Sequence, residues 1–348
     1  MKVLLVTSER GLRGGERQLL LLNEGLQQLG CTTALCARHR ARVLEGMPHV
    51  FPVPMANALD FRGALAIRQA AESFGADLIH AFTARAHTLA QSAGRPMVVT
   101  RSVAYKAGKT FLGRRKYRKA GAHFIAVSQA AAAALREAGT APEQIHVIPP
   151  AIRVEALGTR REDARALLGL SHGAIALGCV AALEPEKGLA DLLAAAAQLE
   201  VPATLFIVGD GSLRAELEQK GRQSGQVEVR FLGHREDVGQ LLPAFDLYLQ
   251  PSLKEGFGLA LVEAMACGVP VIASRTGGLA EIVRHEENGL LTPPADPAAL
   301  AAIMRAALDD LDTAARRAAL AREEVRAKYL PSAMVEATLA VYRQALGR

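Results

Sequence analysis

The segment PSLKEGFGLALVEAMACGVPVIAS, residues 251–274, decides the fold class of this chain. Its residues 255–258 (EGFG) suit a loop, and the apolar run 259–267 suits a helix. Gly268 is then expected to end the helix before a run rich in valine and isoleucine, which favours a strand. A loop followed by a helix and a strand is the repeating element of a parallel sheet covered by helices.

The rest of the second half repeats this alternation of short apolar runs and amphipathic segments. Strands are expected at residues 175–180, 204–208, 227–231, 247–249 and 269–273. Apolar residues at spacings of three and four predict helices at 297–308, 314–328 and 331–346. We therefore expect a doubly wound domain over residues 151–330, and a last segment, 331–348, that crosses back to the first domain.

The first half has the same rhythm. Strands are expected at residues 3–7, 78–80, 97–100, 124–127 and 146–148, with helices at 16–29, 84–93 and from 128 to 139. The pair Pro149-Pro150 ends the pattern, because proline cannot continue either element. The predicted fold class is α/β, with two Rossmann-like, doubly wound parallel-sheet domains that face a cleft, the first over residues 1–150.

The bulk composition agrees with a folded protein of two domains. A chain of 348 residues exceeds the usual size of one hydrophobic core, and 50% hydrophobic with 22% charged residues is typical of globular proteins. The four cysteines form no CxxC pair, which favours buried thiols in a reducing cytosol. The first apolar run is too short for a signal peptide, and no run reaches 18 residues, so we expect a cytoplasmic protein without a transmembrane helix.

The charge is divided unevenly between the halves. Residues 1–150 carry 20 Lys and Arg against 9 Asp and Glu, whereas residues 151–348 carry 21 against 26. Eight basic residues lie between Arg101 and Lys119. This basic region predicts an anionic partner, either a membrane surface or a phosphorylated acceptor, and a solvated helix face explains it equally well. Few aromatics and no recognition module argue against a nucleic acid partner.

Three glycines follow the first predicted strand. In ERGLRGGERQ, Gly14 and Gly15 let a ligand approach the backbone, and Glu16 is expected to start a helix whose N–H groups favour an anion. The spacing is not GxGxxG, and no acidic residue follows near position 36. A dinucleotide-dependent oxidoreductase is therefore disfavoured.

Two further turns lie after strands of the second domain. LEPEKG offers Lys187 to a phosphate, and VGDGSLR offers the backbone at Gly209 and Gly211. A plain turn and a solvated lysine are the alternative interpretations, and both remain open. Two such turns at one edge of a sheet support each other, since ligands bind outside the carboxyl ends of parallel strands.

The segment that decides the fold also carries two carboxylates, Glu255 and Glu263, separated by seven residues. Glu255 and the adjoining Gly256 lie at the expected helix entrance, near a reacting sugar. Glu263, just over one turn into the helix, can accept two hydrogen bonds from ribose hydroxyls. The N–H groups of Phe257, Gly258 and Leu259 are expected to bind a pyrophosphate without a metal.

These motifs resemble those of the GT-B glycosyltransferases, in particular the retaining enzymes of family four, over essentially the whole chain. The second half contributes E-x7-E, LEPEKG, VGDGSLR, FLGHRED, SRTGGLAEIV and NGLLTPPADPAAL, and the first half GGE, DLIHAF and IAVSQA. The resemblance implies transfer of a sugar from a nucleotide diphosphate to an acceptor hydroxyl, with the anomeric configuration retained. It implies no metal and no cofactor beyond the nucleotide sugar, which is a co-substrate.

The resemblance also implies roles for individual residues. Glu255 would lie near the donor sugar, Glu263 on the ribose and Lys187 on the diphosphate. The turn at Gly14 and Gly15 would face the phosphates from the other domain. Helix dipole and lysine would then stabilise the departing diphosphate as its charge develops.

The sequence departs from the family pattern at two places. The family has an arginine shortly before its lysine motif, whereas this chain has Ala181 and Ala182. The family also has a histidine after the strand that ends here in Arg101 and Ser102. We expect Arg101 to supply the missing positive charge. His80 is a further candidate to contact substrate, with a structural role as the alternative.

The predicted function is an active transferase of cell-envelope glycan or lipopolysaccharide biosynthesis. Its acceptor would be a glycan, a lipid-linked sugar or lipopolysaccharide at the inner face of the membrane, where a basic first domain is favoured. A non-catalytic nucleotide-sugar-binding scaffold is the alternative, motivated by the two departures. An epimerase of the same fold is disfavoured, because E-x7-E is associated with the retaining transferases.

Overall fold

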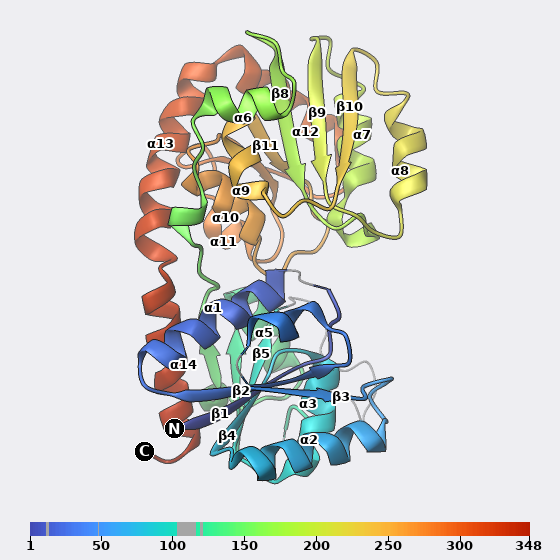
Figure 1. Cartoon of the computed structure of the whole chain (residues 1–348). Coiled ribbons are helices and arrows are strands. Elements are labelled where there is room, and N and C mark those ends of the chain that lie inside the picture. The colour runs from blue at the N-terminus through green and yellow to red at the C-terminus, as the bar shows by residue number, and fades with distance from the viewer. Residues whose placement is uncertain (12–13, 48, 103–115, 119–120) are drawn as a thin grey trace. The chain divides into compact units, whose positions relative to one another are not determined.

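The computed structural model describes residues 1–11, 14–47, 49–102, 116–118 and 121–348. The chain folds into two compact units, coloured along the sequence in Figure 1. The first unit consists of Met1–Ala151 together with Tyr329–Arg348, and the second of Ile152–Lys328. The predicted α/β class, with two doubly wound parallel sheets, is confirmed.

The first unit is built on a seven-stranded parallel sheet with the order β3-β2-β1-β4-β5-β6-β7. The strands are β1 (Lys2–Thr7), β2 (Thr32–Arg38), β3 (Val50–Val53), β4 (Leu78–Ala81), β5 (Met97–Arg101), β6 (Ala122–Ala126) and β7 (Ile145–Val147). β1 lies between β2 and β4, with Val3 opposite Thr33 and Leu78. The direction of strand addition therefore reverses between β1 and β4.

Helices cover both faces of this sheet. They are α1 (Gly14–Gln28), α2 (Phe61–Phe74), α3 (Ala84–Ala90), α5 (Gln129–Glu137) and α14 (Pro331–Ala345). Asp60 caps α2 by accepting a hydrogen bond from the Gly63 N–H, and Ser128 caps α5 by accepting one from the Ala131 N–H. Ser128 is therefore the N-cap residue of α5.

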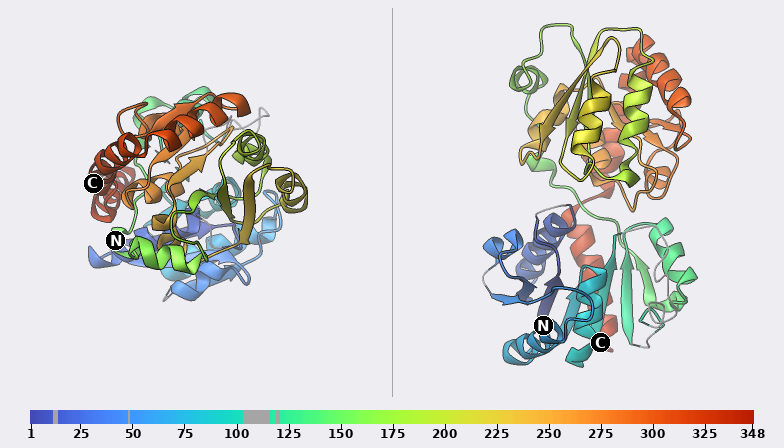
Figure 2. Two further views of the ribbon diagram at one scale, coloured as in Figure 1. Left: turned by 90° about the horizontal axis from the view of Figure 1, so that it is seen from above. Right: turned by 90° about the vertical axis from the view of Figure 1, so that its right-hand side faces the viewer.

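The core of the first unit contains a helix from the far end of the chain. α1 packs against α14, and the apolar side chains of both helices share one buried cluster with the sheet. Leu22 and Leu26 from α1 meet Val335 and Tyr342 from α14 in this cluster. The helix pair lies against the sheet in Figure 2. The first unit is therefore complete only when residues 329–348 are added.

The second unit contains a six-stranded parallel sheet with the order β10-β9-β8-β11-β12-β13. The strands are β8 (Ile175–Val180), β9 (Ala203–Val208), β10 (Val227–Gly233), β11 (Leu247–Gln250), β12 (Val271–Ser274) and β13 (Leu290–Thr292). β8 pairs with β9 on one side and with β11 on the other. The point at which strand order reverses is therefore between β8 and β11.

Helices also cover this sheet on both faces. They are α6 (Arg161–Leu167), α7 (Leu189–Ala196), α8 (Arg214–Gly221), α9 (Val238–Leu241), α10 (Leu259–Ala266), α11 (Leu279–Ile282), α12 (Pro297–Asp309) and α13 (Leu311–Lys328). α7, α8 and α12 contribute to one buried cluster with β8, β9 and β11. Figure 2 shows α7 and α8 side by side against the sheet.

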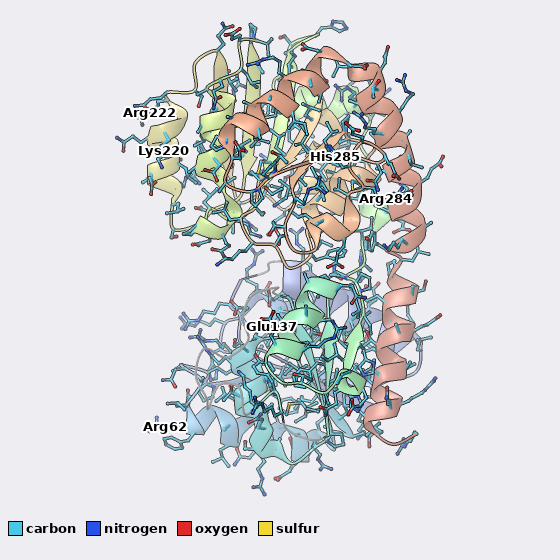
Figure 3. All side chains as sticks on the ribbon, turned by 180° about the vertical axis from the view of Figure 1, so that it is seen from behind. Arg62, Glu137, Lys220, Arg222, Arg284 and His285 are labelled. Atoms are coloured by element: carbon cyan, nitrogen blue, oxygen red, sulfur yellow. The ribbon has the colours of Figure 1, made fainter. Side chains whose placement is uncertain are left out.

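The long helix α13 is fastened to the loop after α11 by charged side chains. Arg284 forms an ion pair with Glu324 of α13, as the position of Arg284 beside this helix in Figure 3 illustrates. The Arg317 Nε also donates to the Glu286 carbonyl over 2.9 Å. Within the described ranges, no helix combines the length and apolar character needed to cross a membrane.

Candidate functional site

The candidate site lies at the carboxyl edge of the sheet in the second unit. β8 and β11 are neighbours at the point where strand order reverses (Figure 1), which is where open parallel sheets bind ligands. The loop after β8, residues 181–188, carries Lys187. The loop after β11, residues 251–258, carries Glu255.

Backbone contacts join these two loops. The N–H groups of Leu253 and Lys254 both donate to the Glu186 carbonyl, over 2.8 and 3.2 Å. Gly188 has a φ of +65°, and a Cβ at this position would lie 2.1 Å from the Pro251 carbonyl oxygen. Only glycine fits so close to another backbone, so the two loops form one fixed surface.

The loop after β9 packs on the loop after β8 in the same way. The Leu183 N–H donates to the Asp210 carbonyl over 3.1 Å. A Cβ on Gly209 would lie 1.9 Å from the Ala181 carbonyl oxygen, and one on Gly211 would lie 2.5 Å from that of Leu183. This packing alone accounts for both glycines, and their predicted contact with a ligand stays a prediction.

The loop after β12 holds the Glu255 backbone from the other side. The Gly278 N–H donates to the Glu255 carbonyl over 3.2 Å, and the Thr276 hydroxyl donates to the Leu253 carbonyl over 3.2 Å. Gly277 has a φ of +47°, and a Cβ there would lie 1.9 Å from the Glu255 carbonyl oxygen. The loops after β8, β11 and β12 therefore fix the position of Glu255 together.

The structure brings Lys187 and Glu255 into direct contact. The Lys187 Nζ lies 2.8 Å from the Glu255 Oε2, and the side chains are 21% and 12% exposed. An ion pair screened from water to this extent is stronger than a pair on the surface. The remaining exposure of the Lys187 and Glu255 side chains leaves both groups accessible to a ligand at the edge of the sheet. Two of the residues selected from sequence thus form the centre of the site.

Three buried polar side chains behind Glu255 were missed by the sequence reasoning. The Ser252 hydroxyl lies 3.1 Å from the Glu255 Oε2, and the Gln250 Nε2 lies 3.4 Å from the same oxygen. The Tyr248 hydroxyl donates to the Gln250 Oε1 over 2.7 Å. Burial raises the pKa of Tyr248 well above its usual value. A signal for these residues existed, because polar side chains at alternate positions of an apolar strand share one face.

The entrance to α10 has the predicted form. Gly256 and Phe257 are buried in the loop, and Leu259 is the first residue of the helix. Gly258 occupies the N-cap position with a φ of +107°, and a Cβ there would lie 2.4 Å from a methyl group of Leu279. The loop and helix expected over residues 255–267 are therefore confirmed in position.

Glu263 lies half-buried in α10, in the same unit as Glu255. Its charge contributes to the raised pKa of two neighbours. Burial raises the pKa of Cys267 to about 12 and the Glu263 carboxylate adds to this shift, and the same carboxylate acts on Tyr248. The helix then ends as expected, because Gly268 has a φ of +76° and its N–H donates to the Met265 carbonyl.

The predicted glycine turn of the first unit belongs to a helix. α1 begins at Gly14, two residues before the predicted start, so Gly14 and Gly15 lie in its first turn. A Cβ on Gly15 would meet no atom within 4 Å. Glu16 is only 3% exposed and accepts a hydrogen bond from the Thr7 hydroxyl over 3.3 Å. Protein packing therefore does not require glycine at position 15.

His80, a candidate to contact substrate, lies inside the first unit with 1% of its surface exposed. Its Nδ1 lies 2.6 Å from the Tyr342 hydroxyl, and its Nε2 lies 2.7 Å from the Thr100 hydroxyl. Burial lowers the pKa of His80 to about 3, so the ring is neutral near pH 7. This setting favours the structural alternative, in which His80 joins β4 to α14.

Arg101 ends β5, as predicted, and lies near other basic and aromatic groups. Its guanidinium is 5.9 Å from the centre of the Tyr117 ring, and the Lys116 Nζ is 5.2 Å from the same ring. Burial, with Arg101 as the second cause, lowers the pKa of Lys116 to about 8. The rest of the basic region, residues 103–115 and 119–120, lies outside the described residues. Arg101 belongs to the first unit, whereas Ala181 and Ala182 belong to the second, so the expectation that Arg101 supplies the missing positive charge stays a prediction.

Metal-binding side chains do not gather at the site. Among the described residues, no group of three or more His, Cys, Asp or Glu side chains has the arrangement of a metal centre. Cys31, Cys36 and Cys179 are buried free thiols, as expected, and Cys267 is half-buried.

Family models match both units. Residues 160–324 match the model of glycosyl transferases group 1, and residues 12–156 match that of glycosyltransferase family 4. A relative named D-inositol 3-phosphate glycosyltransferase 1, from Catenulispora acidiphila, is 35% identical over 226 residues, which cover 60% of this chain and 53% of the relative. N-acetyl-alpha-D-glucosaminyl L-malate synthase of Bacillus anthracis is 35% identical over 163 residues, which cover 46% of this chain and 43% of that protein. The chain thus spans about half the length of these curated relatives.

Similarity to solved structures extends over nearly the entire chain. The crystal structure of Anabaena HepE in complex with UDP and glucose is 26% identical, with a TM-score of 0.87. The alignment covers 99% of this chain and 100% of HepE. The complex of HepE with UDP-glucose gives the same identity and TM-score.

Proposed function

The chain belongs to the GT-B glycosyltransferases of group 1, and from this premise we propose that it transfers a sugar from a nucleotide diphosphate to an acceptor hydroxyl. The observation that carries the proposal is the Lys187–Glu255 pair of 2.8 Å, placed where the strand order of the second sheet reverses. A cation beside a carboxylate at this edge suits a ligand that carries both a diphosphate and a sugar.

The reaction needs stabilisation of the departing diphosphate. In the proposed step the bond from the anomeric carbon to the diphosphate oxygen breaks. The acceptor hydroxyl gives its proton to the departing diphosphate, and the acceptor oxygen bonds to the same carbon with its configuration retained. Lys187 and the N-terminus of the eight-residue helix α10 would meet the negative charge that develops on the diphosphate. No divalent cation is required in this scheme, because protein groups supply the positive potential.

The donor is proposed to be a uridine diphosphate sugar. HepE, which is 26% identical over nearly the whole chain, is described in complexes with UDP and with UDP-glucose. Glu263 is proposed to accept hydrogen bonds from the ribose, and Glu255 to lie beside the sugar. The backbone of α1 at Gly14 and Gly15 is the proposed contact from the first unit, since it is a helix N-terminus with open space at Gly15.

The acceptor is proposed to carry an anionic group. The first 150 residues hold 20 basic against 9 acidic residues, and the Catenulispora relative is named for a phosphorylated inositol. A phosphorylated sugar or a lipid-linked glycan at the inner membrane face satisfies this charge, and cell-envelope or lipopolysaccharide synthesis is the narrower form of the proposal.

A panel of UDP-, GDP-, ADP- and TDP-glucose tests the proposal. We expect UDP-glucose, rather than the other three donors, to raise the melting temperature and to be hydrolysed slowly without acceptor. The product should have the retained configuration by NMR, and EDTA should leave the activity unchanged. Glu255→Gln and Lys187→Met should lower kcat for hydrolysis by roughly 10²–10³-fold and leave a measurable rate, whereas Gly169→Ala, at an open turn of the same unit, should keep the wild-type kcat. Binding without turnover would favour the scaffold. The absence of both binding and turnover would refute the proposal.

A further inference from the structure

We propose that Tyr248, Gln250 and Ser252 are positioning residues, which hold the Glu255 carboxylate in the orientation that the reaction uses. The inference rests on the proposed function, because it assigns these side chains a purpose in the same site. The three side chains are buried, so they act through Glu255 and not directly on a ligand.

The strand places the three side chains in one row. Tyr248 and Gln250 belong to β11 and Ser252 follows it, so the residues alternate along an extended segment and face the same way. Their exposed fractions are 0%, 3% and 0%. Leu247 and Leu249 point to the opposite face and enter the apolar cluster with α7 and α12. The polar row therefore leads from the interior of the unit to the edge of the sheet.

The hydrogen bonds of this row have a single direction. Glu255, when ionised, can only accept, so the Ser252 hydroxyl donates to its Oε2 over 3.1 Å. Ser252 then accepts from the Gln250 Nε2 over 3.0 Å, and the Gln250 Oε1 accepts from the Tyr248 hydroxyl over 2.7 Å. Hydrogen bonds aligned in this way strengthen one another in a buried setting.

The charge of Glu255 and the hydroxyl of Tyr248 together determine which way the Gln250 amide is turned. A flipped amide would turn the Gln250 oxygen toward the carboxylate oxygen 3.4 Å away, and it would lose the donation to Ser252. The Tyr248 hydroxyl lies 3.3 Å from the Val180 carbonyl as an alternative acceptor, but the shorter contact of 2.7 Å goes to Gln250. Tyr248 is thus the buried end of the row that selects this orientation.

Three donors from the described residues converge on one carboxylate oxygen. Lys187 at 2.8 Å, Ser252 at 3.1 Å and Gln250 at 3.4 Å all reach Oε2. Among the described residues, no hydrogen bond ends on Oε1. The carboxylate is thereby prevented from rotating, and its second oxygen is left for a ligand at the edge of the sheet. Preorganised polar groups of this kind are worth most where charge changes during the reaction.

Two variants that keep side-chain volume test the row. Gln250→Met removes the amide, and Tyr248→Phe removes only the most distant hydroxyl. We expect kcat for donor hydrolysis or transfer to fall roughly 10–100-fold in Gln250→Met and roughly 3–10-fold in Tyr248→Phe, with the KM for the donor changed by less than about threefold. A fall in stability without a fall in kcat would overturn the inference.

Asn288 provides a matched control in the same unit. Its buried amide also donates to a carboxylate, that of Glu324, over 2.9 Å, and its side chain is 2% exposed. Asn288→Leu should therefore lose stability like Gln250→Met and keep the wild-type kcat. An equal loss of kcat in both variants would mean that loosening the unit, rather than the orientation of Glu255, lowers the rate.

A double-mutant cycle with Glu255→Gln separates positioning from general damage. If the row acts through the carboxylate, Gln250→Met should lower kcat no further once Glu255 is replaced. The same fold loss in both backgrounds would overturn the inference.

Thermal unfolding of the same four proteins tests the contact without substrate. The shifts in melting temperature should be non-additive, and additive shifts would also overturn the inference. If this coupling is present and the wild-type protein turns over no donor in the panel, the proposed function fails while the hydrogen-bonded row stands.

Discussion

Substitution of Gly277 by alanine tests whether the loop after β12 sets the position of Glu255. Gly277 has a φ of +47°, in the left-handed region, and its added Cβ would lie 1.9 Å from the Glu255 carbonyl oxygen. Alanine in the left-handed region costs about 1 kcal/mol. Relief of the contact requires the two backbones to part by about 1 Å, which as an overpacked core costs a further ~1–3 kcal/mol.

The free energy of unfolding of the second unit should therefore fall by about 2–4 kcal/mol in Gly277→Ala. The displacement also moves Glu255 and weakens the 3.2 Å hydrogen bond from the Gly278 N–H. A misplacement of about 1 Å at a reacting centre lowers turnover by about 100-fold. Loss of rate and loss of stability are thus expected together.

Gly169→Ala is the matched control for backbone strain. Gly169 lies in the same unit with a φ of +65°, and a Cβ there would meet no atom within 4 Å. Urea unfolding should show a loss of about 1 kcal/mol at most, and turnover of the accepted donor should stay at the wild-type level. If Gly277→Ala matched Gly169→Ala in both measurements, the contact of this loop with Glu255 would have no energetic or catalytic importance.

Three further predictions concern other contacts. Lys187→Met should lower kcat by roughly 10²–10³-fold in steady-state assays, and retention of wild-type kcat would exclude the lysine from the diphosphate site. The pKa of His80 is about 3 in the folded chain against 6.5 when unfolded, so the unfolded state binds more protons between these values. The unfolding free energy of the first unit should therefore fall by about 2 kcal/mol from pH 7 to pH 5 in urea titrations, and an equal slope in His80→Gln would contradict this. A Cβ on Gly25 would lie 2.4 Å from the Val335 Cγ2, so Gly25→Ala should lower the melting temperature and Val335→Ala should restore part of the loss. Additive losses in the double variant would contradict that contact.

The central strands could be predicted from sequence because burial on both faces leaves a continuous apolar run. β8 occupies residues 175–180, as expected, and lies between two other strands. The edge of the first sheet was missed for physical reasons. β2 (TTALCAR) is rich in small residues, and β3 (VFPV) contains Pro52, which is tolerated only at an edge.

α2 was also missed, although its limits were readable. Asp60 caps the start of the helix, and Gly75 ends it with a φ of +69°. Gly63 lies in the first turn of α2, and glycine is a poor helix former. The structure accounts for that glycine, since a Cβ on Gly63 would lie 2.3 Å from the Pro54 carbonyl oxygen.

The centre of the site was predictable, and the reasons for its glycines were not. Lys187 and Glu255 follow adjacent strands, and residues that follow adjacent parallel strands are expected to lie at the same edge of the sheet. Gly209 and Gly277 are required by backbones 28 and 22 positions away in sequence, at Ala181 and Glu255. Such contacts cannot be predicted from the spacing of residues along the chain. His80 is a similar case, because its partner Tyr342 is 262 residues distant.

The presence of α14 in the core of the first unit determines the order in which the chain can fold during translation. Residues 152–328 leave the ribosome as one continuous stretch and can fold at once, since their core needs nothing that follows. Leu22 and Leu26 of α1 are synthesised far earlier, but their buried cluster is completed only when Val335 and Tyr342 have been made. The unit that is synthesised first therefore completes its core last. A ribosome that stalls before residue 331 releases a chain whose second unit is folded. The core of its first unit is incomplete and accessible to chaperones and proteases.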